Sequence, residues 1–271
     1  MPDHAPAHAF FLAVPPGERY CLYHAPVGAC RGALVYVHPF AEEMNKSRRM
    51  AALQARALAA AGYGVLQIDL YGCGDSDGDF GQARWEQWHA DLAAARAWLG
   101  QQLGRPAGLW GLRLGALLAL EHAHTNPVPQ LLLWQPVLQG ASYLTQFLRL
   151  RVANDMLDEG ANSGGTKALR AELDAGHALE IAGYELAPQL AARIDALDAA
   201  QLAPACPTHW IEIVAAAERP LPPAAGRVAQ TWGQQPPVKV AGAAFWSTQE
   251  IAECPELIAA TCAMLTDAQH V

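Results

Sequence analysis

Several features that mark common classes of protein are absent from this sequence of 271 residues. Lys and Arg total only 18, against 26 Asp and Glu, and they form no dense basic run. A protein that binds nucleic acid through surface charge needs such a run, so the net charge of −8 argues against a nucleic-acid partner. We interpret the negative charge as a contribution to solubility.

Signals for metal binding and for membranes are missing as well. The six cysteines form no C-x-x-C pair, the spacing typical of zinc and dithiol sites. Scattered thiols in a chain of this size favour a reducing compartment, so we expect a cytoplasmic protein. No apolar run approaches the ~20 residues of a membrane span, and the N-terminal stretch has no signal-peptide pattern. We therefore expect no membrane span, no metal and no cofactor.

What the sequence does have is an alternation of apolar runs with helical patterns. Apolar residues make up 52% of the chain, enough for a sizeable core. The alternation predicts an α/β fold, with a mostly parallel sheet and helices on both faces. A hairpin is expected first, at residues 9–14 and 18–24. The expected sheet strands that follow are residues 32–38, 64–70, 107–110, 130–138, 208–215 and 237–242, and the expected helices are residues 43–61, 84–103, 113–124 and 249–266.

One long segment interrupts this rhythm. Residues 140–204 are helical, polar and Ala-rich, with no convincing strand. A long insertion between strands is usually a functional lid or a linker, and its helical pattern favours a cap over the carboxyl edge of the sheet. We expect a core made of residues 1–139 and 205–271, with residues 140–204 as the cap. The Pro-rich residues 218–226 are interpreted as a loop.

Three short motifs follow one another along the predicted core. They are "YVHPFAEEMNKSRRM" (residues 36–50), "DLYGCGDSDG" (69–78) and "GLRLG" (111–115). Together they resemble the α/β-hydrolase fold, with its oxyanion loop, its D-x-x-G-x-G-x-S turn and its G-x-S-x-G nucleophile elbow. These stretches and "FWSTQEIAECPELI" (245–258) also resemble the exosortase A system-associated hydrolase group, second type. That resemblance implies the hydrolase fold and an exopolysaccharide and protein-sorting context, without naming a substrate.

The triad of a serine hydrolase is incomplete in this sequence. The centre of the elbow holds Arg113, and a guanidinium offers no lone pair for attack. Glu218 follows the strand at 208–215, where the acid of a triad would stand. After the strand at 237–242, where the base would stand, there is no histidine before His270. We interpret the serines and Cys73 near the motifs as turn or packing residues.

Arg113 is expected to hold negative charge. The elbow places this cation at a helix N-terminus, which is itself positive, so an anion must lie nearby. The anion is either internal, from Glu42, Glu43 or Glu218, or it is a carboxylate, phosphate or acidic sugar of a ligand. A mixed arrangement, with one edge of the guanidinium on a glutamate and the other facing a ligand, is the third alternative.

Further candidate residues flank the same strand ends. Pro39 has no N–H, so Phe40 and Leu114 are the expected backbone donors to an oxyanion. His38 is either a general base or an organiser of its loop. Phe40 and Trp246 are candidates for an aromatic wall beside a sugar ring, and ordinary core packing is the alternative.

Two functions are consistent with these residues. One is a hydrolase of the exosortase or exopolysaccharide system that acts on an ester, acyl or sugar-type substrate, with Arg113 stabilising charge and His38 or Glu43 as base. The other is a catalytically silent member that binds an anionic metabolite, a glycolipid precursor or a protein partner. The sequence leaves the oligomeric state open, with a homodimer as one option.

Overall fold

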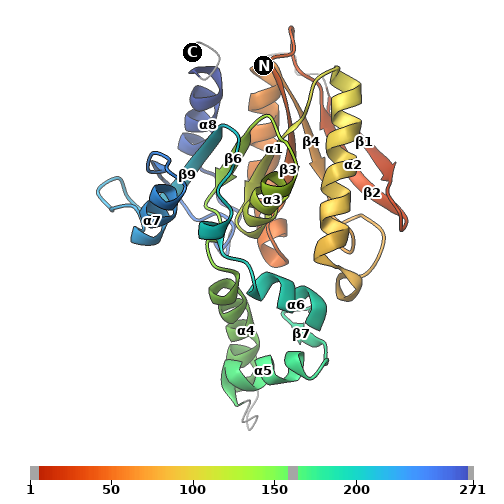
Figure 1. The fold of residues 1–271 in the computed structure, drawn as a ribbon, viewed down its shortest axis with the longest axis vertical. Helices are drawn as coiled ribbons and strands as arrows, with labels where there is room; N and C mark the ends of the chain where they lie inside the picture. The colour runs from red at the N-terminus through yellow and green to blue at the C-terminus, as the bar shows by residue number, and fades with distance from the viewer. Residues whose placement is uncertain (1–5, 158–163, 268–271) are drawn as a thin grey trace.

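A computed structural model describes residues 6–157 and 164–267, and these form a twisted sheet between two layers of helices, with a smaller lobe below (Figure 1). Eight strands lie in the order β1-β2-β4-β3-β5-β6-β9-β10. Only β1 and β2 run antiparallel to their neighbours. The expected mostly parallel sheet is confirmed. The strands are β1 His8–Ala13, β2 Glu18–His24, β3 Gly32–Val37, β4 Tyr63–Ile68, β5 Gly108–Leu112, β6 Leu131–Trp134, β9 Thr208–Val214 and β10 Val238–Ala241.

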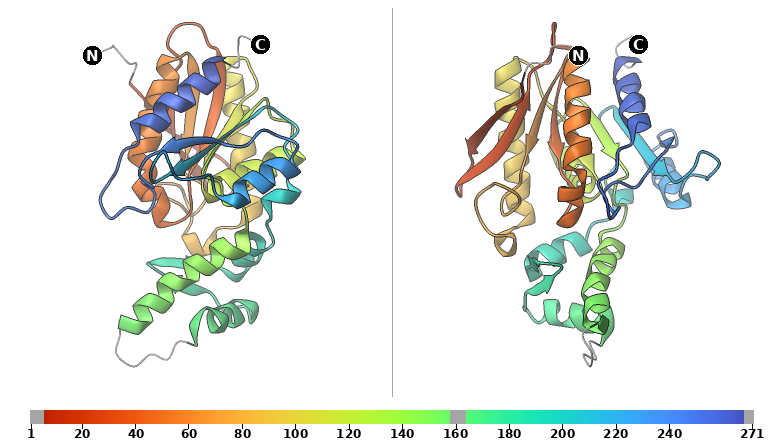
Figure 2. Two further views of the ribbon diagram at one scale, coloured as in Figure 1. Left: turned by 90° about the vertical axis from the view of Figure 1, so that its left-hand side faces the viewer. Right: turned by 180° about the vertical axis from the view of Figure 1, so that it is seen from behind.

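Alternating side chains of the central strands enter two separate cores. Val35 and Leu109 pack toward α2 (Trp85–Leu103) and α3 (Leu114–Thr125). Their neighbours Leu34 and Trp110 pack on the other face, which α1 (Glu42–Ala60) and α8 (Pro255–Asp267) cover (Figures 1 and 2). Because successive residues of a strand point to opposite faces, a strand covered on both must be apolar throughout.

Three local expectations were wrong. The closing helix begins at Pro255 and not at 249, because proline is favoured in the first turn of a helix, where its missing N–H costs nothing. Helix α7 (Pro223–Thr231) occupies part of the presumed Pro-rich loop for the same reason. The insertion also contains a short hairpin, β7 (Leu179–Ile181) and β8 (Tyr184–Leu186), whose three-residue strands are too short for a periodic signal.

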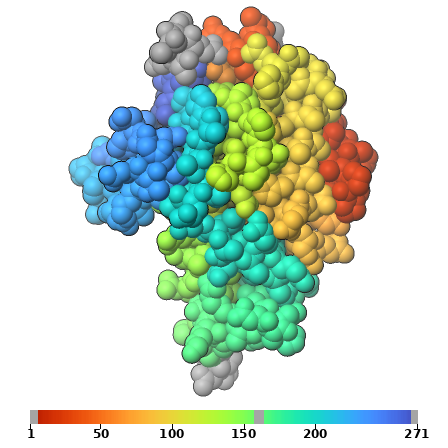
Figure 3. Space-filling view, in the orientation of Figure 1, coloured from red at the N-terminus to blue at the C-terminus, as the bar shows by residue number. Residues whose placement is uncertain are grey.

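The insertion, residues 140–204, leaves the sheet between β6 and β9 and forms the lower lobe (Figure 3). Its helices are α4 (Gly140–Leu157), α5 (Gly165–Asp174) and α6 (Pro188–Asp195), followed by the 3-10 turn Ala199–Gln201. The two ends of the insertion meet where the Gly140 N–H donates to the Leu197 carbonyl at 2.8 Å. A Cβ on Gly140 would lie 1.7 Å from the Ile194 carbonyl oxygen, so only glycine permits this approach.

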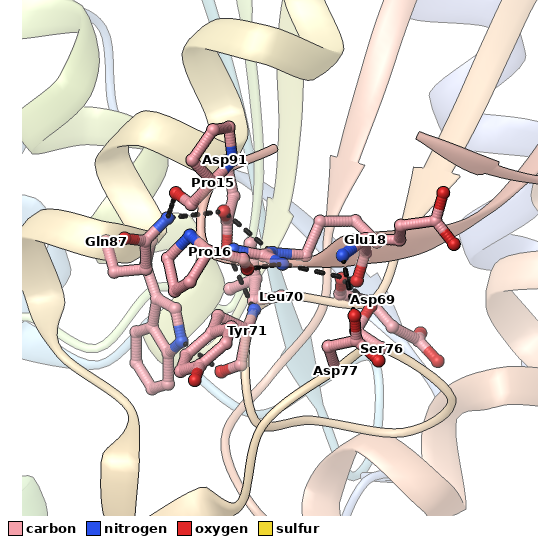
Figure 4. A network of polar contacts seen from close by, with 12 residues as sticks. Pro15, Pro16, Glu18, Asp69, Leu70, Tyr71, Ser76, Asp77, Gln87 and Asp91 are labelled. Atoms are coloured by element: carbon pink, nitrogen blue, oxygen red, sulfur yellow. Dashed lines mark hydrogen bonds and ion pairs between the residues drawn. The ribbon is translucent and has the colours of Figure 1, made fainter. Parts of the chain in front are cut away.

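The D-x-x-G-x-G-x-S turn after β4 is a structural junction. The Ser76 hydroxyl donates to the Asp69 carbonyl at 2.6 Å and accepts from the Tyr20 N–H at 2.9 Å, so it ties the turn to β2. Next to it lies a fully buried ion pair, in which Arg19 Nε donates to Asp91 at 2.8 Å. Asp91 also accepts from the Tyr71 N–H, and this contact fixes the path of the turn (Figure 4).

Candidate functional site

The site is built on the turn between β5 and α3, which keeps the backbone of a nucleophile elbow. Arg113 stands at its centre with φ 57° and ψ −120°, a conformation that side-chain-bearing residues rarely adopt. A Cβ on Gly111 would meet the Ala116 backbone at 2.4 Å, and one on Gly115 would meet the His38 carbonyl at 2.2 Å. The two glycines therefore let α3 press against β5 and β3, and this sharp turn directs Arg113 above the sheet edge.

The Arg113 guanidinium is paired along one edge. Its Nε and Nη2 both donate to Glu43 Oε1 at 3.3 Å. Its carbon lies 5.7 Å from the centre of the Tyr143 ring and 5.4 Å from that of Trp246, within the range of cation–π attraction. Within the described chain, Nη1 has no hydrogen-bond acceptor. The internal partner expected for Arg113 is therefore present in Glu43, and one edge of the guanidinium has no partner among the described residues.

Glu43 links the elbow to the insertion. It lies in the first turn of α1, and its Oε2 accepts from the Tyr143 hydroxyl of α4 at 3.2 Å. Burial raises the pKa of the Glu43 carboxyl, and the Arg113 charge opposes that rise. Burial and the neighbouring Glu43 hold the pKa of Tyr143 well above its ordinary value, so the hydroxyl stays a donor. Arg113, Glu43 and Tyr143 thus form one connected polar group.

Glu212 is a residue near this group that the sequence interpretation missed. It lies on β9, 2% exposed, and accepts from Trp210 Nε1 at 2.9 Å. Burial raises the pKa of its carboxyl to about 7, against the lowering effects of Trp210, Arg113 and Gln135. A lone glutamate inside the apolar run "THWIEIVA" was the signal that could have identified it, because a buried strand rarely carries a carboxylate.

His38 is engaged at both ring nitrogens. Nδ1 lies 2.8 Å from the Pro39 carbonyl, and Nε2 lies 3.2 Å from the Leu70 N–H. These partners require Nδ1 to carry the proton and Nε2 to accept. Burial lowers the pKa of the ring, which keeps it neutral. His38 therefore ties the loop after β3 to the turn after β4. This geometry fits an organiser of the loop and not a base facing a substrate.

The two other candidate carboxylates lie away from Arg113. Glu42 neighbours Glu43 in α1, but its carboxylate accepts from Asn45 and Tyr184 at 3.1 and 3.3 Å. The helical turn of about 100° per residue directs the two side chains to different partners. Glu218 is exposed in the loop after β9, and in the described chain its side chain bonds to no other residue. The expectation that Glu42 or Glu218 neutralises Arg113 was therefore wrong.

Of the remaining candidates, Trp246 contacts Arg113, and Phe40 and Leu114 are packed in the core. Trp246 lies against Arg113 in the loop after β10. Phe40 is buried in an aromatic cluster, with ring centres 5.2 Å from Phe80 and 5.0 Å from Phe147. The Leu114 side chain is buried, but its N–H and that of Gly115 have no acceptor in the part of the chain that the structure describes. Phe40 and Leu114 both line a narrow apolar cavity of about 10 Å³.

A serine–histidine or cysteine–histidine couple does not occur among the described residues. Among the hydroxyls near the motifs, Ser76 bonds to Asp69, and Ser142 bonds to the Gln139 side chain at 3.3 Å. The buried Ser47 hydroxyl has no hydrogen-bond partner among the described residues. His270 lies outside the described residues. Within residues 6–157 and 164–267, no three His, Cys, Asp or Glu side chains are grouped to hold a metal. Over the same residues, no helix combines the length and the apolarity needed to cross a bilayer.

Arg113 opens onto a cleft of about 400 Å³ between the core and the insertion. Its polar walls include Arg227 of α7, Asp198, and hydroxyl and amide side chains of α4. A cleft of this size fits a small molecule. The lining residues are Arg113, Pro136, Val137, Leu138, Gln139, Ser142, Tyr143, Gln146, Asp198, Ala200, Ala224, Arg227, Val228 and Thr231.

Comparison with known protein families identifies the family of this chain. The family model described as "Serine aminopeptidase, S33" matches residues 28–168, more than half of the chain and the whole of the elbow region. The chain belongs to this family. Arg113 and the two glycines of its turn lie within the matched residues. No curated protein matches the chain significantly.

Solved structures similar to this S33 member are α/β hydrolases. Est1E from Butyrivibrio proteoclasticus with bound ferulic acid is 14% identical, over 96% of this chain and 98% of that one, with a TM-score of 0.71. A soluble monoglyceride lipase variant from Saccharomyces cerevisiae, in complex with a substrate analogue, is 13% identical, over 97% and 96%, with a TM-score of 0.65. XC6422 from Xanthomonas campestris, a serine hydrolase without a lid, is 17% identical, over 97% and 93%, with a TM-score of 0.56. At these identities the likeness shows the α/β-hydrolase fold.

Proposed function

We propose that this chain binds a small anionic molecule at Arg113, in the cleft between core and insertion, without serine-based hydrolysis. The observation that carries the proposal is the guanidinium at the centre of the elbow, which lines a cleft of about 400 Å³ and whose Nη1 has no partner among the described residues. A forked cation suits carboxylate and phosphate oxygens. The unpaired N–H groups of Leu114 and Gly115, at the N-terminus of α3, add further attraction for negative charge.

We also propose that the insertion acts as a cap, with residues 1–139 and 205–271 as the core. Ser142, Tyr143 and Gln146 of α4 form one wall of the cleft, so a ligand there touches both parts. Tyr143 supports this role further, because its hydroxyl bonds to the core residue Glu43.

A second candidate function is hydrolysis of an ester, acyl or sugar-type bond by water. Membership in the S33 family favours it, as does the raised pKa of Glu43, the base closest to Arg113. Arg113 and the N–H groups of Phe40 and Leu114 would then stabilise the developing negative charge. Both Glu43 oxygens already accept hydrogen bonds, so a water would have to displace one of them.

The motifs also support a place in the exosortase or exopolysaccharide system, which we propose on that resemblance alone. A strain lacking the chain should then alter its exopolysaccharide or its sorting of exported proteins. Unchanged polymer and unchanged sorting would remove this part of the proposal.

The central test separates binding from hydrolysis in the intact chain. A fluorophosphonate probe should label no serine, and p-nitrophenyl esters should not turn over above the rate in buffer. Calorimetry should detect binding of simple carboxylates, and Arg113→Gln should weaken it about tenfold or more, the loss of a charge-assisted pair. Arg149→Gln removes an exposed arginine outside the cleft and serves as control.

Stoichiometric labelling of a serine would overturn the non-hydrolytic proposal. Because Arg113→Gln also leaves Glu43 unpaired, its melting temperature is measured in parallel. If Arg113→Gln destabilises the chain but binds carboxylates as tightly as the wild type, then Arg113 is a structural partner of Glu43 alone.

A further inference from the structure

A second cation lines the cleft that holds Arg113. Arg227 projects from α7, which follows β9, and its side chain is exposed. Over the described residues it makes no ion pair and no side-chain hydrogen bond. The outline of the molecule is notched between α7 and the start of the insertion (Figure 3). Two arginines from distant parts of the sequence therefore face one small space.

The walls around these cations combine hydrogen-bonding groups with apolar surface. Ser142, Gln146 and Thr231 offer hydroxyl and amide groups, whereas Val137 and Val228 are apolar. Such a lining suits a short carbon chain with charged ends, because the chain contacts the valines while the ends bind polar groups. The volume of about 400 Å³ limits the ligand to a small molecule.

One carboxylate, Asp198, shares the cleft. Its Oδ1 accepts from the Ala200 N–H at 2.9 Å, which caps the 3-10 turn Ala199–Gln201. It lies in no ion pair with Arg113 or Arg227. Glu43 pairs with Arg113, so the two arginines and the two carboxylates carry no net charge when all four are ionised. The attraction for an anion therefore comes from the free edge of Arg113 and from Arg227.

We propose that the cleft binds a dianion, with one anionic group at the free edge of Arg113 and the second at Arg227. This inference rests on the proposed function and specifies its ligand. A monoanion contacts one arginine only. A dianion gives each arginine an acceptor: the exposed Arg227 fork can bind a carboxylate through two parallel hydrogen bonds, and the free Nη1 of Arg113 can donate to the other anionic group. Arg227 is then the residue that selects for the second charge.

The test compares molecules of equal length that differ by one charge. Succinate, glutarate, adipate and suberate are titrated by calorimetry at low ionic strength, each beside its own monomethyl ester. The best diacid should bind about tenfold more tightly than its ester. Arg227→Gln should bring the two dissociation constants together by weakening the diacid alone. Asp198→Asn keeps the hydrogen bond from the Ala200 N–H and removes a negative charge that repels the diacid. This variant should therefore bind the diacid more tightly.

The outcomes distinguish binding of a dianion from the proposed binding of an anion at Arg113. If diacid and ester bind equally tightly, or if Arg227→Gln leaves their ratio unchanged, the dianion is wrong and binding at Arg113 stands. If neither diacids nor esters bind, both proposals fall. Arg149→Gln should leave all the dissociation constants unchanged, which controls for the loss of a positive charge elsewhere.

Discussion

Arg113 has the backbone conformation of a nucleophile elbow, but its guanidinium cannot attack a carbonyl. The φ of 57° and the flanking glycines are the costly part of the elbow, and both are present. The side chain that this backbone presents is a permanent cation, whose partners are a carboxylate and two aromatic rings. A residue that cannot attack a carbonyl can still hold an anion in the place where an oxyanion would form.

Glu212 allows a prediction at the same scale. Its carboxyl has a pKa of about 7, against an ordinary value of 4.5, so the folded chain binds this proton more tightly than the unfolded chain. The free energy of unfolding should therefore fall as the pH rises from 4.5 to about 7. The full effect is about 3 kcal/mol, at about 1.4 kcal/mol for each unit of pKa.

The substitution Glu212→Gln keeps an acceptor for Trp210 and cannot ionise. Its melting temperature should exceed that of the wild type at pH 8, and the difference should vanish near pH 4.5. Thermal melts across this range measure it, with Glu218→Gln as a control at an exposed carboxyl. An equal difference at both pH values would mean that ionisation of Glu212 is not the cause.

At the scale of elements, the insertion is attached to the core at both sides. On the side of the cleft, the attachment runs from Tyr143 through Glu43 to Arg113. On the other side, Arg193 of α6 reaches Glu86 of α2 at 3.2 Å and Glu121 of α3 at 2.9 Å. Burial opposes ionisation of Glu121, but hydrogen bonds from His89, Trp85 and Arg193 lower its pKa to about 2. This ionic attachment therefore persists into acid.

Removing Arg193 should loosen α6 without unfolding the core. The pair is partly exposed, so the expected loss is about 1 kcal/mol. In Arg193→Gln, hydrogen exchange of the α6 amides should become several-fold faster, while exchange in β5 stays unchanged. Arg151→Gln breaks contacts within the insertion alone, an ion pair with Asp155 and a hydrogen bond to the Glu180 carbonyl, and is the matched control. Unchanged exchange in α6 would mean that the Arg193 ion pairs do not hold this helix against the core.

At the scale of the whole molecule, the chain keeps the fold of a hydrolase family around an altered centre. The sheet depends on apolar alternation and the elbow on Gly111 and Gly115, and neither depends on the identity of the central side chain. The scaffold therefore accommodates an arginine at the centre of this turn. The α7 helix and the insertion supply the other walls of the cleft.

Much of this arrangement was predictable, and the failures have identifiable causes. The strands and main helices follow from periodicity, because burial on both faces demands continuous apolar runs. Contacts between side chains do not follow from periodicity. Glu42 and Glu43 are chemically identical neighbours, and only the orientation of α1 brings Glu43 to Arg113. Arg227 was not predicted, because nothing local in its sequence indicates that α7 borders the cleft.

The sequence by itself determined the sheet, the glycine-flanked turn after β5 and the presence of an arginine at its centre, since each depends on residues close together in the chain. The tertiary structure alone decided which carboxylate pairs with Arg113, that His38 is fully bonded, and that a second arginine shares the cleft. Charges act over distances in space, and the fold sets those distances by bringing together elements that the chain keeps far apart.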